Sequence, residues 1–380
     1  MDTEIKSSNW ETKTLGEVCE VVGGGTPKTG IPVYWSDEIV WVTPKDLGQL
    51  STVEIFDTNK YISKKGLEKS SAKLLPKGSV VMSSRAPIGY VAIAGVDLAT
   101  NQGCRNFICH DNIFNKYLYY FLFANTELLN SLGGGATFRE ISGTTLKDIE
   151  IPVPPLSEQK RIVKILDEKF GVIEELQNIT KKQIADAKEL FESRLDEVYS
   201  SPDYNFGNLG DSVNIKTGKL NSNAAVVGGD YPFFTCSRQA SQIDSYSFDC
   251  DAVLLAGNNA SADFNVKHYK GKFDAYQRTY VITVLNNAEL DIRFVYNLLL
   301  HGLAKFKESA VGAGTKFLKI GMIQDFQLPL FTLKEQKQIV KELDELSVKT
   351  KELETIFHQK IADLEELKKS YLADAFAGKL

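Results

Sequence analysis

Two long segments of the chain place apolar residues three or four positions apart, with charged residues between them. This spacing predicts amphipathic helices. About 40 residues at about 1.5 Å each give a helix of about 60 Å, which is too long to be buried in one globule. We therefore expect the two helices to pair antiparallel as an imperfect coiled coil. The predicted seam contains Ile173, Leu176, Ile184 and Leu190 in the first segment, and Leu353, Phe357, Leu364 and Leu367 in the second.

The two helical segments are copies of one another. Pro152 aligns with Pro329, so the residue numbers of the two copies differ by 177 (329 − 152), a difference called the repeat offset below. Of the 44 pairs up to Leu195 and Leu372, 21 are identical, and the alignment has no gap. A chain with two copies indicates a pseudo-twofold protein rather than a solenoid, which needs more repeats. The simpler alternative, in which each helix only caps the core of its own domain, stays open.

Two stretches that differ from each other precede the two copies. They are rich in Gly, Tyr and Phe and contain short β-branched runs such as residues 39–44 and 279–285, which predict strands. One helix is expected around residues 115–131 and its counterpart around 291–307. The fold class is therefore α/β (α+β), with two globular domains separated by two long helices. The predicted boundaries are 1–150 for the first variable domain, 151–200 for the first repeated helix, 201–327 for the second variable domain and 328–380 for the second repeated helix.

The composition is that of an ordinary globular protein. The net charge of −5 and the pI near 5.6 argue against a general nucleic-acid binder. The five cysteines are scattered without a CxxC pair, which indicates neither a disulfide framework nor a zinc site. The amino-terminal residues lack the apolar core of a signal peptide, and no apolar run approaches membrane-spanning length. We expect a cytoplasmic protein that contacts no membrane.

Two basic clusters depart from this acidic balance. Seven basic residues against one acidic residue lie between Lys60 and Arg85, and a smaller cluster lies between Lys267 and Arg278. Lys and Arg contact DNA phosphates, and Arg, Asn and Gln match base edges. A solvated lysine surface, or Asn and Gly that form turns, are the simpler interpretations. The candidate DNA-contacting residues are Lys60, Lys64, Lys65, Lys69, Lys73, Ser84, Arg85, Asn101, Gln102, Arg105 and Arg139 in the first domain, and Arg238, Asn258, Asn259, Lys267, Lys270, Lys272, Gln277, Arg278 and Lys316 in the second.

Motifs for chemistry are missing from the sequence. The single Pro-Pro pair, Pro154-Pro155, lacks the polar and aromatic neighbours of an adenine methyltransferase tetrapeptide, and no GxxxxGK phosphate loop occurs. The four histidines are scattered. We therefore expect a non-catalytic protein without cofactor or metal, although an enzyme with an unrecognised site stays an alternative.

The order of variable domain and Glu-Gln-Lys-headed helix, repeated twice, resembles the DNA sequence-specificity subunit of type I restriction-modification systems. The strings that carry the resemblance are LGEVCEVVGGGTPKT from Leu15, WVTPKDL from Trp41, NQGCRNF from Asn101, IPVPPLSEQKRIV from Ile151, and TGKL followed by YPFFTCS from Tyr231. The resemblance implies two target recognition domains that each read one half of a split double-stranded DNA site. It also implies paired helices that set the spacing and dock two methyltransferase subunits, with restriction or translocase subunits as further partners.

The heads of the two repeated helices are candidate subunit contacts. The residues are Glu158, Gln159, Lys160, Glu335, Gln336 and Lys337. The competing interpretation is helix initiation, with the glutamates acting on the helix dipole and the glutamines on exposed backbone. A coiled-coil scaffold whose variable domains bind protein or glycan partners is the alternative function.

Overall fold

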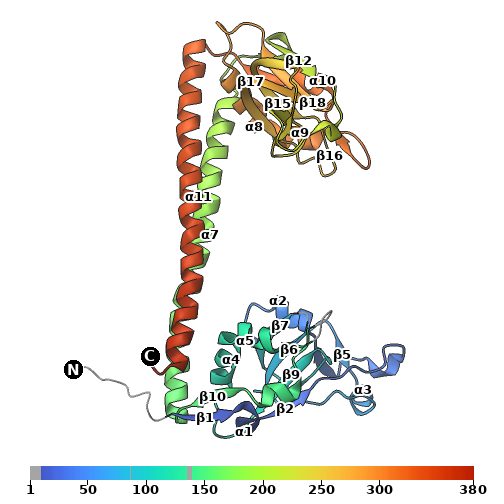
Figure 1. Ribbon diagram of the computed structural model, residues 1–380, viewed down its shortest axis with the longest axis vertical. Coiled ribbons are helices and arrows are strands. Elements are labelled where there is room, and N and C mark those ends of the chain that lie inside the picture. Colours follow the sequence, from blue (N-terminus) through green and yellow to red (C-terminus); the bar gives the residue numbers. More distant parts are fainter. Residues whose placement is uncertain (1–9, 86, 135–138) are drawn as a thin grey trace, which may run out of the picture. The chain divides into compact units, whose positions relative to one another are not determined.

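The computed structural model describes residues 10–85, 87–134 and 139–380. It divides into two compact units, Met1–Ile179 with Lys360–Leu380, and Thr180–Gln359. Both long helices, α7 (Leu156–Ser200) and α11 (Leu333–Phe376), contribute to both units. Each unit therefore contains one variable domain, the start of one long helix and the end of the other (Figure 1).

The first variable domain is built on a five-stranded sheet in the order β2-β9-β6-β7-β4, with a three-stranded sheet β5-β3-β8 beside the lysine cluster. The strands are β2 (Cys19–Gly23), β3 (Ile39–Val42), β4 (Glu54–Ile55), β5 (Tyr61–Ile62), β6 (Val80–Ser84), β7 (Ile88–Ala94), β8 (Leu98–Thr100) and β9 (Cys104–Cys109). The helices are α1 (Leu15–Val18), η2 (Pro32–Tyr34), α2 (Pro44–Gln49), α3 (Lys64–Glu68), α4 (Asn115–Ala124), α5 (Thr126–Leu132) and α6 (Gly143–Lys147). An antiparallel pair, β1 (Glu11–Thr14) with β10 (Glu150–Val153), leads into α7.

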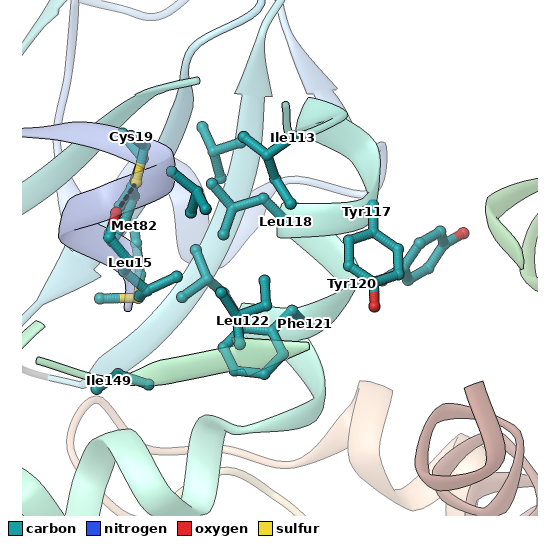
Figure 2. Packing of buried hydrophobic residues seen from close by; sticks show 14 of the residues in the cluster. Leu15, Cys19, Met82, Ile113, Tyr117, Leu118, Tyr120, Phe121, Leu122 and Ile149 are labelled. Atoms are coloured by element: carbon teal, nitrogen blue, oxygen red, sulfur yellow. Dashed lines mark hydrogen bonds between the residues drawn. The ribbon is translucent and has the colours of Figure 1, made fainter. Parts of the chain in front are cut away.

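Helix α4 joins the sheet of the first domain to the long helices. Its sequence, NKYLYYFLFA, is apolar on almost every side, which is typical of a helix buried on two faces. Leu118 packs among Leu15, Met82 and Ile113 in the core (Figure 2). The adjacent Tyr117 extends this core to the long helices, since its ring lies 5.1 Å from the Phe376 ring of α11.

The second variable domain is built on a six-stranded sheet in the order β12-β18-β15-β17-β13-β14. Its strands are β12 (Val213–Thr217), β13 (Tyr231–Phe234), β14 (Ser241–Ile243), β15 (Phe248–Ala256), β17 (Val266–Ala275) and β18 (Thr279–Val284), with the short pairs β11 (Phe206–Asn208) and β20 (Gln327–Pro329), and β16 (Asn258–Asn259) and β19 (Lys316–Phe317). Its helices are η3 (Leu209–Asp211), η4 (Ser222–Ala224), α8 (Ile292–His301), α9 (Leu303–Ser309) and α10 (Ile320–Gln324). Each helix expected upstream of a repeated segment is thus two consecutive helices, α4–α5 and α8–α9.

The backbones of the two domains correspond beyond the repeated helices. Leu15 N–H donates to Ile149 O at 2.8 Å, and Leu209 N–H donates to Phe326 O at 2.8 Å. The two acceptors, Ile149 and Phe326, are separated by the repeat offset. Each domain also contains a hydrogen-bonded turn, described below. The residues that bond to these turns are equivalent in the two domains, so Val42 corresponds to Phe234 and Ser84 corresponds to Gly257. Those offsets are 192 (234 − 42) and 173 (257 − 84), so the first domain is longer by 19 (192 − 173) between them. This longer segment contains the whole run from Lys60 to Lys73.

Within each unit the start of one long helix runs antiparallel to the end of the other. In the first unit, Arg161 Nη2 donates to Leu380 O at 2.6 Å, and Gln177 Nε2 donates to Glu365 Oε1 at 2.5 Å, so α7 advances as α11 recedes. In the second unit, Arg194 of α7 pairs with Glu342 of α11 at 3.0 Å. The antiparallel pairing predicted from the repeats is present in both units.

The seam between the helices differs from the predicted one at three leucines. Ile173 and Leu364 are buried, and Leu176, Ile184 and Phe357 are half-buried. Leu190, Leu353 and Leu367 are exposed at 60%, 42% and 40%, so their assignment to the seam is wrong. The residue that follows each of these leucines is half-buried instead. These residues are Phe191, Glu354 and Lys368. The seam also buries the polar residues Gln177, Thr180 and Thr350. Because part of the seam is polar, the spacing of leucines alone does not identify it.

Candidate nucleic-acid interface

A tight turn at residues 101–104 lies at the centre of the candidate residues in the first domain. Cys104 N–H donates to Asn101 O at 3.0 Å, which closes the turn, and Asn101 N–H donates to Val42 O at 2.8 Å. The Asn101 side chain accepts from Gly103 N–H at 2.7 Å and donates to Thr26 Oγ1 at 3.1 Å. Asn101 is therefore a turn former, as the simpler interpretation had it, and Gln102 is exposed at the tip.

Glycines allow the chain to pass close to this turn. A Cβ on Gly24 would lie 2.0 Å from Asn101 O, and a Cβ on Gly25 would lie 2.1 Å from Ala72 N. Glycine is thus required at both positions, because the backbone of another segment lies where a side chain would begin. The second contact also brings the segment that bears Lys69 and Lys73 alongside the turn.

Three charged side chains meet beside the turn. Arg105 Nη2 lies 3.1 Å from Glu140 Oε1, and Arg85 Nη1 lies 3.7 Å from Glu140 Oε2. Arg105 also donates to Cys104 O at 3.1 Å, so it holds the start of its strand as well as the carboxylate. The two arginines and Glu140 line a pocket of about 550 Å³ whose other walls include Gln102, Thr144 and Lys147. Arg139 is exposed next to Glu140.

The second domain contains the same kind of turn at residues 276–279. Thr279 N–H donates to Tyr276 O at 2.8 Å, and Tyr276 N–H donates to Phe234 O at 2.9 Å. Gln277 and Arg278 are both exposed at the tip. Gln277 Nε2 donates to Asn221 Oδ1 at 2.8 Å, and the Arg278 guanidinium lies 5.9 Å from the centre of the Phe317 ring.

Polar and basic side chains surround this second turn. Asn258 accepts a hydrogen bond from Cys236 Sγ at 2.9 Å, and Asn259 pairs with Lys316 between β16 and β19. Arg238 binds both oxygens of Asp263, at 2.7 and 2.9 Å. Lys267 Nζ donates to Ser237 O at 2.6 Å, and burial lowers the pKa of this lysine.

Some predicted DNA contacts lie elsewhere. Ser84 is fully buried, so its assignment as a DNA contact is wrong. Lys270 lies 3.6 Å from Asp251, and Lys272 lies 4.6 Å from the centre of the Tyr246 ring; neither contact involves the turn. Lys60, Lys64, Lys65, Lys69 and Lys73 are exposed around α3, and their contact with DNA stays a prediction. Sequence reasoning missed Glu140 and Phe317, which are separated by the repeat offset and differ in chemistry.

The glutamines at the heads of the repeated helices are structural. Gln159 and Gln336 are 0% and 4% exposed. Their amide oxygens accept from Phe114 N–H at 2.7 Å and Asp291 N–H at 2.8 Å. Their amide nitrogens donate to two backbone carbonyls each, Asn112 and Pro154 for Gln159, and Glu289 and Phe331 for Gln336. These partners are themselves separated by the repeat offset. The assignment of the glutamines as subunit contacts is therefore wrong; each glutamine instead ties the segment before α4 or α8 to the head of a long helix.

The two glutamates of these heads also contact their own helices. Glu335 accepts from Thr332 N–H at 2.8 Å and from Thr332 Oγ1 at 2.7 Å, which lowers the pKa of this carboxyl. Glu158 pairs with Arg161 at 2.6 Å, and that contact lowers its pKa. Lys160 and Lys337 are exposed, and a partner contact there stays a prediction.

Neither a metal-binding group nor a membrane-spanning helix is found in the described part of the chain. No three His, Cys, Asp or Glu side chains among residues 10–85, 87–134 and 139–380 gather as a metal site would require. Over the same residues, every helix is too short or too polar to cross a bilayer.

Two variable domains that present the same turn, each joined to a repeated helix, define a class of duplicated recognition protein. The family model for the type I restriction modification DNA specificity domain matches residues 7–185 and 202–366, and the chain belongs to this family. The resemblance inferred from the sequence is therefore confirmed.

Relatives share parts or most of the chain. The MjaIX specificity subunit of Methanocaldococcus jannaschii is 42% identical over 174 residues, which are 43% of this chain and 40% of that protein. The EcoDI specificity subunit of Escherichia coli is 38% identical over 45% of this chain and 37% of its own length. These alignments thus span about two fifths of those relatives. The EcoprrI specificity subunit of Escherichia coli is 23% identical over 88% of this chain and 87% of that protein.

Solved structures share the fold. One, from work on the assembly and conformational transition of the type I R-M system, has a TM-score of 0.80 at 19% identity and covers 98% of this chain and 99% of its own. The HsdS subunit from Thermoanaerobacter tengcongensis has a TM-score of 0.62 at 18% identity and covers 98% of each chain. The predicted α/β class with two domains and two long helices is therefore confirmed.

Proposed function

We propose that each variable domain reads one half of a split double-stranded DNA site. The observation that carries this proposal is the same hydrogen-bonded turn in both domains, each flanked by cationic side chains, in a chain of the specificity family. Arginine and lysine beside the turn would contact phosphates, and side chains at the tip would reach base edges. On this proposal the chain acts on host DNA in the cytoplasm.

The chemistry belongs to partner subunits in this proposal. The sequence holds neither a methyltransferase tetrapeptide nor a phosphate loop, so the chain supplies recognition and its partners supply methylation. Two methyltransferase subunits would dock on the repeated helices, and restriction or translocase subunits would join them.

Duplicated apolar residues on the helices support two equivalent docking surfaces. Ile179 and Ile356, which are separated by the repeat offset, are exposed at 46% and 60%. Leu190 and Leu367, another identical pair, are exposed at 60% and 40%. Exposed apolar residues repeated at matching positions in both units are typical of surfaces that partners cover.

The experiment that tests recognition is co-expression with a methyltransferase subunit of the same system, followed by single-molecule sequencing that maps methylated bases in host DNA. We expect one split motif that disappears when this chain is deleted. Exchange of one variable domain should alter one half of the motif. A stable complex with an active methyltransferase but no split motif would contradict the proposal. That result would favour the alternative of a coiled-coil scaffold.

Docking is tested separately on the helix. Leu353→Pro breaks α11 at a cost of about 3 kcal/mol or more, and we expect it to abolish co-elution with the methyltransferase on size exclusion. Leu353→Ser is the matched control, because this side chain is exposed and the substitution leaves the helix intact. Co-elution that survives Leu353→Pro would contradict docking on this helix.

A further inference from the structure

A glutamine occupies the same position of the same turn in both variable domains. Gln102 and Gln277 each follow the residue whose carbonyl closes the turn, Asn101 or Tyr276. Their offset is 175 (277 − 102), which differs from the repeat offset, so the sequence repeat does not align them. Of the residues at the four turn positions, NQGC and YQRT, the glutamine alone is shared.

Backbone hydrogen bonds on both sides of the glutamine establish the equivalence. Ser84 N–H donates to Gly103 O at 2.8 Å, and Gly257 N–H donates to Arg278 O at 2.7 Å. Gly24 N–H donates to Cys104 O at 3.3 Å, and Gly218 N–H donates to Thr279 O at 3.4 Å. The two turns therefore sit against the same two strand ends in their domains, and the two glutamines leave the backbone at matching points.

Each glutamine is held at one end and exposed. Thr26 Oγ1 donates to the amide oxygen of Gln102, and the amide nitrogen of Gln277 donates to Asn221 Oδ1 at 2.8 Å. Thr26 and Asn221 stand shortly after Gly24 and Gly218, so the holding group comes from the same segment in both domains. A side chain held this way loses less conformational entropy when it binds a partner.

The exposed amide matches one base edge. A glutamine amide carries a donor and an acceptor side by side, which pair with N7 and N6 of adenine in the major groove. Gln102 borders the pocket lined by Arg85 and Arg105, and Gln277 adjoins Arg278, so each amide stands beside arginine side chains.

We propose that Gln102 and Gln277 are equivalent base-reading residues, each of which contacts an adenine in its own half-site. This inference rests on the proposed function and deepens it. The residues around the two glutamines differ, so each half-site contains an A·T pair read by glutamine, with different neighbouring bases.

The test compares Gln102→Ala and Gln277→Ala in the co-expressed complex, with methylated bases mapped by single-molecule sequencing and binding measured on variant duplexes. We expect Gln102→Ala to lower discrimination about tenfold or more at one A·T pair of one half-site and to leave the other half unchanged. Gln277→Ala should do the reverse. Gln327→Ala is the control, because this exposed glutamine of the second domain lies outside the turn and its amide nitrogen donates to Asn208 at 2.9 Å and to Asp325 O at 3.1 Å.

A second variant separates base contact from support of the turn. Gln102→Glu keeps an oxygen that accepts from Thr26, so a role confined to holding the turn would survive. It loses the donor that N7 of adenine requires, so we expect the same loss of discrimination as with alanine. A methylation motif unchanged by Gln102→Ala and Gln277→Ala would overturn the inference, as would relaxation at a pair without adenine. If wild-type protein directs no split motif, the proposed function fails first.

Discussion

The two variable domains present one turn in two chemical settings. Gly103, Arg105 and Glu140 of the first domain correspond to Arg278, Tyr280 and Phe317 of the second, by offsets of 175, 175 and 177. In the first domain, Glu140 draws two arginines together and offsets part of their charge. In the second, the Arg278 guanidinium lies over the ring of Phe317 instead. The difference teaches that the backbone frame of the turn is independent of the side chains that face a partner.

The largest expected effect tests whether the two buried glutamines at the heads of the long helices, Gln159 and Gln336, contribute equally to the stability of their domains. Gln159→Ala and Gln336→Ala each leave one backbone N–H and two carbonyls without their partner, so we expect each to lower the free energy of unfolding of its domain by about 2–4 kcal/mol. Urea unfolding followed by hydrogen exchange in α4 and α8 would measure both. The surface variant Gln338→Ala should change little. A loss in one domain and none in the other would break the comparison.

The next effect concerns the difference between the two turns. Arg278→Ala should relax preference at the second half-site by about 1–3 kcal/mol if the guanidinium reaches a base. Arg105→Ala should relax the first half-site alone, because Arg105 holds the turn and Glu140. Binding curves on duplexes altered in one half at a time measure this effect. Equal relaxation of both halves by either variant would contradict separate readers.

A smaller difference is expected between two corresponding ion pairs. Asp167 accepts from Lys116 at 2.8 Å and from Tyr120 at 2.6 Å. Asp344, its counterpart at the repeat offset, pairs with Arg293 and has Asn297 in place of the tyrosine. Asp167→Asn should lower stability by about 1 kcal/mol, and Asp344→Asn by less. Thermal unfolding of the two variants decides the order, and the reverse order would show that the extra tyrosine contact adds nothing.

The segment by which the first domain is longer, which contains the run from Lys60 to Lys73, is expected to make DNA binding more dependent on salt. Lys64→Ala should weaken binding to all sequences alike and reduce the slope of log K against log salt by about one unit. Lys182→Ala, on an exposed position of α7, is the control and should leave the slope unchanged. An unaltered slope with Lys64→Ala would mean that the lysine cluster is only a solvated surface.

The smallest effect is a pH dependence confined to the second domain. Burial lowers the pKa of His301, Asp196 opposes the shift, and the counterpart of His301 in the first domain is Ala124. The stability that neutral His301 contributes is present above the unfolded pKa of about 6.5 and is lost as the pH falls below it. Hydrogen exchange in α8 at about pH 7.5 and about pH 5.5 should show this loss, and His301→Ala should remove it. A pH dependence that survives the substitution would assign it to other groups.

Much of the fold is predictable from the sequence because it depends on local patterns. The heptad-like spacing of apolar residues specifies two long helices, and the gapless register of the repeat specifies that they are copies. The seam was less predictable, since Gln177, Thr180 and Thr350 turn inward while Leu190, Leu353 and Leu367 face solvent. Burial depends on which face meets the partner helix, and the leucine pattern does not carry that information.

The sequence also identified both basic clusters and both glutamine-bearing loops, because composition and turn-forming residues are readable along the chain. Only the tertiary structure decided that Gln102 and Gln277 stand at one equivalent point, because hydrogen bonds between distant strands, not residue identity, determine that correspondence. It likewise decided that Gln159 and Gln336 are buried anchors, since their partners include backbone groups 45 to 47 residues away along the chain. A backbone donor or acceptor that distant leaves no local trace in the sequence.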